Sequence, residues 1–159
     1  MTRLLAGDLM STEDDMLDAW VDVEERLPWL PLDPYLVGEE RRGLLVDELK
    51  QSGFSVLEID LGTVREERQL KAALGRALVK PEEYADNWDA LRDLLQQRGE
   101  SSPWLIAVVF TEAHAFLRAD VHGFVRSVSV LNSLAEELSS LDDPYGQLEL
   151  FYVGDWTKA

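Results

Sequence analysis

The feature that most restricts the possible folds of this chain is its longest apolar stretch, residues 104–110, in which every side chain is apolar. A strand with no polar residue on either side has to be covered on both faces, which is typical of the centre of a parallel sheet. Two other stretches, 54–61 and 148–153, also have the composition of strands. Long helical segments separate the three strands, and such crossovers connect parallel strands along a right-handed path. We therefore predict an α/β fold with a three-stranded parallel sheet in the order 1-2-3, packed with helices.

Helices are predicted where apolar residues recur at intervals of three and four. In the segment 64–79 the apolar stripe consists of Leu70, Leu74, Ala77 and Leu78. A short helix is predicted over 111–117, and a longer helix begins after Asp120, because aspartate favours helix starts. A further helix is predicted over 88–98. Together these helices and strands form the domain that we assign to residues 54–159.

Residues 1–53 are predicted to form an N-terminal helical extension packed on that domain. Thr12 precedes three consecutive carboxylates, a strong helix start, and apolar residues at helical spacing continue to Leu27. Residues 28–35 mix prolines with aromatic residues and are predicted to be extended. Packing across the protein's own surface is the favoured interpretation of that segment, and a docking peptide is the alternative. A second helix is predicted over 39–51.

The charge balance indicates the kind of partner. The chain has 31 acidic and 15 basic residues and a formal net charge of −16, which argues against direct binding of nucleic acid or of an anionic membrane. It favours a basic protein partner, although acidity for solubility alone is the competing explanation. The chain has no cysteine, and its first residues contain no apolar run of signal-peptide length. We therefore expect a cytoplasmic protein, and a monomer.

Residues 81–95 combine a helix start with a cluster of carboxylates. Asn87 is a favoured N-cap, and Asp89 lies in the first turn, where the helix dipole favours anions. Apolar residues spaced by three, four and seven form one face: Trp88, Leu91, Leu94 and Leu95. Aspartates form another face: Asp86, Asp89 and Asp93. Such a rigid acidic surface suits recognition of a basic partner, and an ordinary solvated helix face is the alternative.

The same stretch contains the pattern P-E-x-Y-x-x-N-x-D-A-L-x-D-x-L. Its residues are Pro81, Glu82, Tyr84, Asn87, Asp89, Ala90, Leu91, Asp93 and Leu95. This order resembles the signature of the barstar family of intracellular ribonuclease inhibitors. A weaker likeness extends over 54–154 and does not include the first fifty-odd residues. The resemblance implies a barstar-like fold and a protein without catalytic activity, one that blocks the active site of a basic ribonuclease or nuclease toxin.

The resemblance also implies the residues that bind the partner. They are Glu83, Tyr84, Asp86, Asp89, Arg92, Asp93, Gln96 and Glu136. Asp93 matches the family's dominant anchor, which is expected to meet the arginine and histidine groups that bind phosphate in the enzyme. Asp89 is placed beside it on the inhibitory face, and Glu136 on the long helix aligns with a further acidic contact. Tyr84 is interpreted as an aromatic residue that pins the loop.

This sequence departs from the family pattern at four positions. Glu83 replaces a contacting tyrosine, and Ala85 replaces a flexible glycine. Arg92 replaces a tryptophan next to the anchor, and Gln96 replaces a small hydroxyl residue. Arg92 is a cation on a face that should enter a cationic cleft, so pairing with Asp89, Asp93 or Trp88 along the helix is one interpretation of its presence.

Other functions have less support in the sequence. His114 and His122 lie in no catalytic or metal-binding context, so both are interpreted as structural or surface residues, and no cofactor is expected. The aspartate cluster of residues 86, 89 and 93 could in principle bind Mg²⁺ or Ca²⁺ and support an enzyme, but such sites usually draw oxygens from several elements, so no metal is expected. The main alternative to inhibition is an adaptor that binds another protein through the N-terminal extension and residues 29–35.

Overall fold

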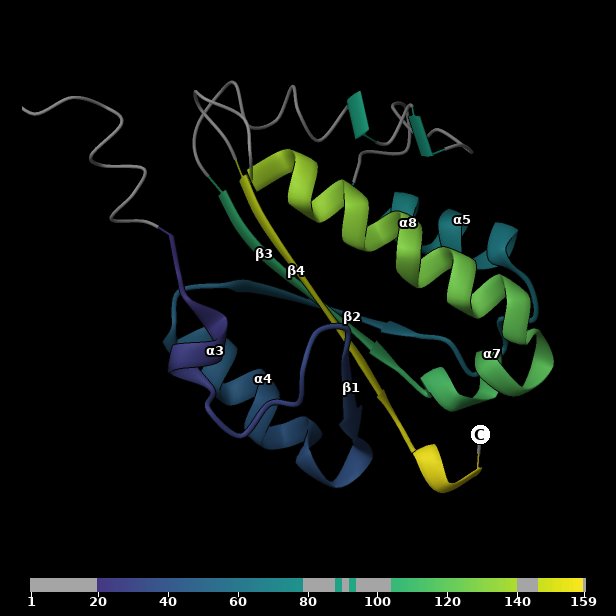
Figure 1. Ribbon diagram of the computed structural model, residues 1–159, viewed down its shortest axis with the longest axis horizontal. Coiled ribbons are helices and arrows are strands. Elements are labelled where there is room, and N and C mark those ends of the chain that lie inside the picture. The colour runs from purple at the N-terminus through teal and green to yellow at the C-terminus, as the bar shows by residue number, and fades with distance from the viewer. Residues whose placement is uncertain (1–19, 79–87, 90–91, 94–103, 140–145, 159) are drawn as a thin grey trace, which may run out of the picture.

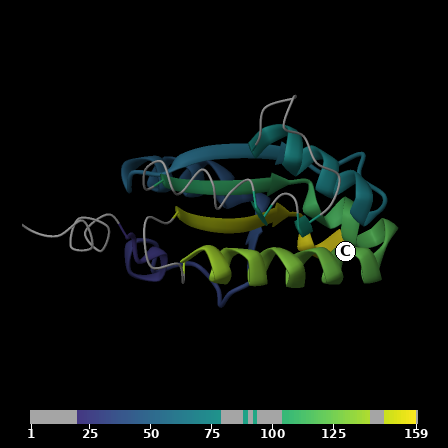
Figure 2. The ribbon, with the colours of Figure 1, turned by 90° about the horizontal axis from the view of Figure 1, so that it is seen from above.

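The computed structural model describes residues 20–78, 88–89, 92–93, 104–139 and 146–158 of this chain. Its centre is one four-stranded sheet, in which all strands are parallel and the order is β1-β4-β3-β2. The strands are β1 (Tyr35–Gly38), β2 (Ser55–Asp60), β3 (Trp104–Thr111) and β4 (Gly146–Gly154). Figure 2 shows β2, β3 and β4 running side by side with the long helix α8 alongside them.

Helices cover the sheet on both faces (Figure 1). Helices α5 (Glu67–Leu78), α7 (Ala113–Ala119) and α8 (Val121–Ser139) lie on one side. The short helix α3 (Val23–Arg26) and helix α4 (Arg42–Gln51), preceded by the 3-10 turn η1 (Glu39–Arg41), lie on the other. A second 3-10 turn, η3 (Trp156–Lys158), follows β4. None of the helices in these described segments combines the length and the apolar character needed to cross a membrane.

The prediction for the centre of the sheet is confirmed. β3 lies between β2 and β4, with Ile59 opposite Phe110 on one side and Val108 opposite Leu150 on the other. Residues 106–110 of β3 are all buried because helices pack against both faces of the strand. The predicted order of the three strands 54–61, 104–110 and 148–153 is therefore correct.

The prediction of three strands is wrong, because the sheet has a fourth strand at its edge. β1 pairs with the C-terminal half of β4, from Tyr35 opposite Phe151 to Gly38 opposite Gly154. The side chains of Tyr35 and Val37 are buried, whereas Leu36 between them is 40% exposed. This strand is too short for its alternation to stand out, and its partner lies more than a hundred residues away in the sequence. Residues 1–53 are therefore not purely a helical extension.

The two faces of the sheet bury two separate apolar clusters. The α5–α8 cluster contains residues from helices α5, α7 and α8 and from alternate positions of β2, β3 and β4. Examples are Leu74, Phe110, Phe124 and Tyr152. The N-terminal cluster lies on the other face and consists of Val21, Val23, Leu27, Tyr35, Val37, Leu45, Leu49, Phe54, Ala107, Val109, Phe151 and Val153. Most of its members precede residue 54, so the N-terminal segment builds one side of the core. The division of the chain at residue 53 stays a prediction.

The helix predicted over 12–27 does not continue through residues 20–22, which are not helical. The side chain of Gln147 on β4 occupies both backbone groups of Val21: Val21 N–H donates to Oε1 (2.9 Å), and Nε2 donates to the Val21 carbonyl oxygen (2.7 Å). A helix would need those backbone groups for its own hydrogen bonds. Helix α3 starts only after Asp22, whose carboxylate accepts a hydrogen bond from Glu25 N–H. Residues 12–19 lie outside the described part of the chain.

The other predicted helices agree with the structure where it describes them. Helices were expected over 39–51, 64–79 and 111–117, and the structure has η1 with α4, α5 and α7 close to those positions. Asp120 caps α8 as predicted, because its Oδ1 accepts a hydrogen bond from Gly123 N–H at 2.9 Å. The predicted helix 88–98 is described only at residues 88–89 and 92–93, and all four are helical.

Candidate functional site

The candidate site is described in part. Asp89, Arg92 and Asp93 lie in the helical residues between α5 and β3, and Glu136 lies near the end of α8. Four further candidates lie outside the described residues: Glu83, Tyr84, Asp86 and Gln96. The interpretation of Tyr84 as a pin for the loop, and the departure at Ala85, fall in the same undescribed part. We call the described residues 88, 89, 92 and 93 the acidic turn.

Trp88 attaches the acidic turn to the body of the protein. Its side chain is partly buried and packs against the α5–α8 cluster. From α5, the ammonium nitrogen of Lys71 lies 5.4 Å from the centroid of the Trp88 ring, within the range of a cation–π contact. The apolar face predicted for this helix is therefore seen at Trp88, and a lysine that the sequence pattern did not suggest completes the contact.

Arg92 pairs with two carboxylates of the same chain. Its Nη1 lies 2.9 Å from Asp89 Oδ1, one turn earlier in the helix. Its Nε lies 2.7 Å from Glu137 Oε2 on α8, a distance typical of an ion pair. The pairing with Asp89 was one of the interpretations open from the sequence. The pairing with Glu137 was not foreseen, because nothing in the sequence brings residue 137 near residue 92.

Asp93 differs from Asp89 in its contacts. Both side chains are exposed, and the Asp89 carboxylate is 86% exposed even though it contacts Arg92. Among the described residues, no hydrogen bond or ion pair engages the carboxylate of Asp93. Glu136 is also exposed, and no contact within the described segments joins it to Asp89 or Asp93. The structure thus brings Asp89, Arg92 and Glu137 together, and in the part of the chain that it describes the carboxylate of Asp93 is exposed and unpaired.

A second region with many carboxylates lies at the carboxyl ends of the strands, where parallel α/β sheets often bind ligands. A cavity of about 560 Å³ there is lined by Glu39, Glu40, Arg42, Glu58, Asp60, Thr111, Glu112 and Val153. Its one cation is already paired, since Arg42 Nη2 lies 2.6 Å from Glu58 Oε1. No group of three or more histidine or carboxylate side chains in the described segments is arranged to hold a metal ion.

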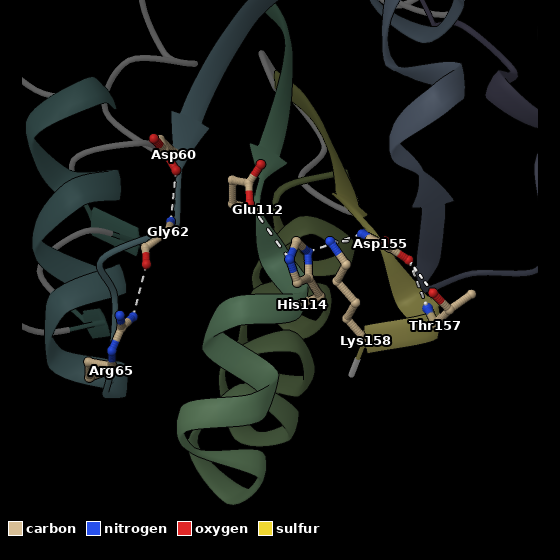
Figure 3. Close-up of polar contacts among 8 residues, drawn as sticks. All are labelled: Asp60, Gly62, Arg65, Glu112, His114, Asp155, Thr157 and Lys158. Carbon is tan, nitrogen blue, oxygen red and sulfur yellow. Dashed lines mark hydrogen bonds and ion pairs between the residues drawn. The ribbon is translucent and has the colours of Figure 1, made fainter.

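His114 lies beside this edge in a structural setting (Figure 3). The ring is buried, and its Nδ1 accepts a hydrogen bond from the backbone N–H of Asp155 at 3.0 Å, while Nε2 lies 3.6 Å from Glu112 Oε2. Asp155 in turn holds η3, because its Oδ1 accepts hydrogen bonds from Thr157, which are also the main reason that the pKa of this carboxyl is lowered. His122 is exposed at the start of α8. This agrees with the interpretation of both histidines as structural or surface residues.

Glu149 is a partly buried carboxylate that sequence reasoning did not single out. It lies on β4, on the side of the N-terminal cluster, and its Oε2 accepts a hydrogen bond from Gln147 Nε2 at 2.9 Å. Burial raises the pKa of Glu149 to about 7, although the hydrogen bond from Gln147 acts in the opposite direction. The neighbouring carboxylates of Asp33, Glu24 and Asp22 raise this pKa further.

The raised pKa of Glu149 predicts that the protein loses stability as the pH rises. The unfolded chain releases this proton near pH 4.5 and the folded chain near pH 7, so the folded state binds more protons between those values. The stabilisation from neutral Glu149 is complete below pH 4.5 and is lost by about pH 7, a change of up to about 3 kcal/mol. Glu149→Gln should therefore raise the free energy of unfolding at pH 8 by about 1–3 kcal/mol and flatten its pH dependence, measured by urea denaturation.

The control for this measurement is Glu25→Gln, which removes an exposed carboxylate from α3. It should leave the shape of the pH profile unchanged. If Glu149→Gln has the same free energy of unfolding as the wild type at pH 8, the assignment of the raised pKa is wrong.

Comparison with known families covers the region just described. The family model Barstar (barnase inhibitor) matches residues 54–150, from the start of β2 into β4, including the acidic turn. The matched region does not include α3, β1 or α4. A search of curated proteins gave no match. The family match spans more than half of the chain and agrees with the resemblance found at residues 81–95. The chain therefore belongs to the barstar family.

Proposed function

We propose that this protein inhibits a barnase-like ribonuclease by placing the carboxylates of the acidic turn in the active site of the enzyme. Barstar is described as the barnase inhibitor, and the members of its family are non-enzymatic inhibitor proteins, in line with the expectation that this chain is not an enzyme. The observation that carries the proposal is the exposed carboxylate of Asp93, which has no partner among the described residues.

The chemistry of the target explains why carboxylates would block it. A ribonuclease has to attract the phosphates of RNA, so its active site is lined with cationic side chains. A carboxylate held at the position of a phosphate accepts charge-assisted hydrogen bonds from those groups and excludes the substrate. Such a contact needs a carboxylate that is not already neutralised within its own chain, and no side chain in the described segments neutralises Asp93.

The remaining candidates take supporting positions in the proposal. Asp89 lies beside Asp93 and shares its charge with Arg92. Glu83, Tyr84, Asp86 and Gln96 are proposed to flank the anchor, and Glu136 is proposed as the contribution of α8. A nuclease toxin with a similar cationic cleft would be recognised by the same chemistry. An adaptor function through residues 1–53 has less support, because most of the buried apolar side chains of the N-terminal cluster come from residues 21–49, although Leu32 in that segment is 87% exposed.

The direct test is inhibition of barnase by the full chain, measured as cleavage of an RNA substrate. With a net charge of −16 and a basic target, the association rate should fall at least about tenfold between low and physiological salt, because ions screen the long-range attraction. Stopped-flow fluorescence gives the association and dissociation rates separately, and salt should act mainly on association. A basic protein of similar size without ribonuclease activity serves as the control for nonspecific attraction. Absence of inhibition, or association that does not depend on salt, would count against the proposal.

A further inference from the structure

We infer that Arg92 is a positioning residue that ties the acidic turn to α8 through Glu137. This role differs from the direct contact to the target that the resemblance implied for this position. Only one part of this inference rests on the proposed function, namely the expected effect of Arg92 on binding to the ribonuclease. The link between residues 92 and 137 is a property of the free protein and can be measured without any partner.

The geometry of the guanidinium supports this role. Different nitrogens of Arg92 contact carboxylates on different elements: Nη1 lies 2.9 Å from Asp89 Oδ1, and Nε lies 2.7 Å from Glu137 Oε2. The contact with Asp89 is a hydrogen bond, whereas the contact with Glu137 is an ion pair in which Nε makes no hydrogen bond within the described segments. A guanidinium can serve both carboxylates because its charge is delocalised over three nitrogens, whereas a lysine ammonium is a single point charge. The Arg92 side chain is 33% exposed, whereas Asp89 is 86% and Glu137 46% exposed, so salt and water screen the pair with Glu137 less than the pair with Asp89.

The position of Arg92 in the helix explains how it would orient the anchor. Trp88 and Arg92 are four residues apart and therefore lie on the same side of the helix, where Trp88 packs on the core and Arg92 reaches α8. Asp89 and Asp93 each follow one of these residues, and both are exposed. Two attachments spaced by one turn thus fix the rotation of the helix and present the aspartates to solvent.

The charges around Arg92 explain why a cation is needed there. Asp89 and Glu137 both contact the same guanidinium, and Asp93 and Glu136 lie next to them in the sequence. Without Arg92, Asp89 and Glu137 would lose the guanidinium that contacts both of them, and like charges at short range repel. The guanidinium offsets this repulsion by pairing with Asp89 and Glu137, and among the described residues no hydrogen bond or ion pair joins it to the exposed carboxylate of Asp93.

Amide hydrogen exchange on the full chain tests the link directly, with the variants Arg92→Met, Glu137→Gln and their combination. Each single substitution should lower the protection of residues 88–93 by about 2- to 5-fold, and the double variant should lose no more than the larger single effect, because the two residues act together. The control is the set Arg42→Met, Glu58→Gln and their combination, since that ion pair has a similar length of 2.6 Å and joins α4 to β2. The control set should leave the protection of residues 88–93 unchanged.

Binding to barnase supplies the second measurement. The double variant Arg92→Met/Glu137→Gln has the same net charge as the wild type, so its association rate and salt dependence should match the wild type. Its dissociation should be about 2- to 5-fold faster, because the anchor is held less firmly. Independent effects of the two substitutions on exchange would overturn the inference. Tighter binding of Arg92→Met with unchanged protection would also overturn it, because that result is expected if the Arg92 cation directly faces the cationic cleft of the enzyme. If the wild type does not inhibit barnase, only the proposed function fails, and the exchange result still decides the role of Arg92.

Discussion

Deleting residues 1–53 is expected to unfold the rest of the chain, although the deleted part precedes the region that matches the barstar family. Residues before position 54 supply most of the N-terminal cluster and the edge strand β1. Their loss would expose one face of the sheet, including Val109, Phe151 and Val153, which are buried in the complete protein. Burial of Val37, Leu45 and Leu49 alone corresponds to roughly 4.5–9 kcal/mol at about 1.5–3 kcal/mol for each side chain. That is comparable to the entire stability of a typical domain.

Circular dichroism, urea denaturation and binding of a hydrophobic dye measure this outcome. The truncated chain should lack a cooperative unfolding transition, bind the dye and fail to inhibit barnase. If it unfolds cooperatively and inhibits as well as the full chain, the N-terminal segment is a separable extension and the expectation is wrong.

Neighbouring leucines on α4 give a milder form of the same test in the complete chain. Leu45 is fully buried in the N-terminal cluster, whereas Leu44 beside it is 44% exposed. Leu45→Ala should lower the free energy of unfolding by about 2–5 kcal/mol, because it removes buried methyl groups and leaves a cavity. Leu44→Ala should cost about 1 kcal/mol or less. Equal costs would show that the N-terminal segment does not form a true core with the sheet.

The contrast between β3 and β1 shows what the sequence could predict about the fold. Residues 104–110 predict a buried central strand because each side chain is apolar, and this pattern can be read from the local sequence alone. β1 has only a single alternation, Tyr35 and Val37 inward with Leu36 outward, and its stability comes from pairing with β4 at the other end of the chain. Likewise, residues 20–22 continue a helical pattern, but Gln147 takes up their backbone groups. Tertiary contacts decide both cases, and no local pattern contains them.

The candidate site likewise has features that the sequence could predict and features that depend on the fold. The aspartate spacing and the family pattern predicted a helical acidic surface, and the described residues of that stretch are helical with Asp89 and Asp93 exposed. The pairing of Arg92 with Asp89 could be anticipated because both lie on one helix turn. The pairing with Glu137 could not, because it depends on how α8 packs beside the turn. The raised pKa of Glu149 also depends on the fold, since the burial and the neighbouring carboxylates that cause it come from separate parts of the chain.

Asp93→Ala is expected to weaken binding of barnase far more than any other single substitution on the acidic turn. Removing one partner of a buried, hydrogen-bonded charge pair costs about 2–5 kcal/mol, a range that draws on the barnase–barstar pair itself and is carried over from it. The corresponding loss of affinity is between roughly 30-fold and several thousand-fold. Much of this cost arises because the cations of the enzyme stay desolvated without a partner. Inhibition assays with barnase and dissociation rates measure the effect.

The comparison with Asp89 makes this prediction specific. Asp89 already shares its charge with Arg92, so part of its interaction energy is present in the free protein and is not gained on binding. Asp89→Ala should therefore weaken binding less than Asp93→Ala, and Glu25→Ala on α3 should have no measurable effect. Asp93→Asn keeps the shape and removes the charge, so it should resemble Asp93→Ala if charge is decisive. Because Asp93 is exposed and makes no contact among the described residues, Asp93→Ala and Asp93→Asn should change the free energy of unfolding by no more than about 0.5 kcal/mol. Equal losses for Asp89→Ala and Asp93→Ala would mean that the internal pairing of Asp89 does not determine which carboxylate serves as the anchor.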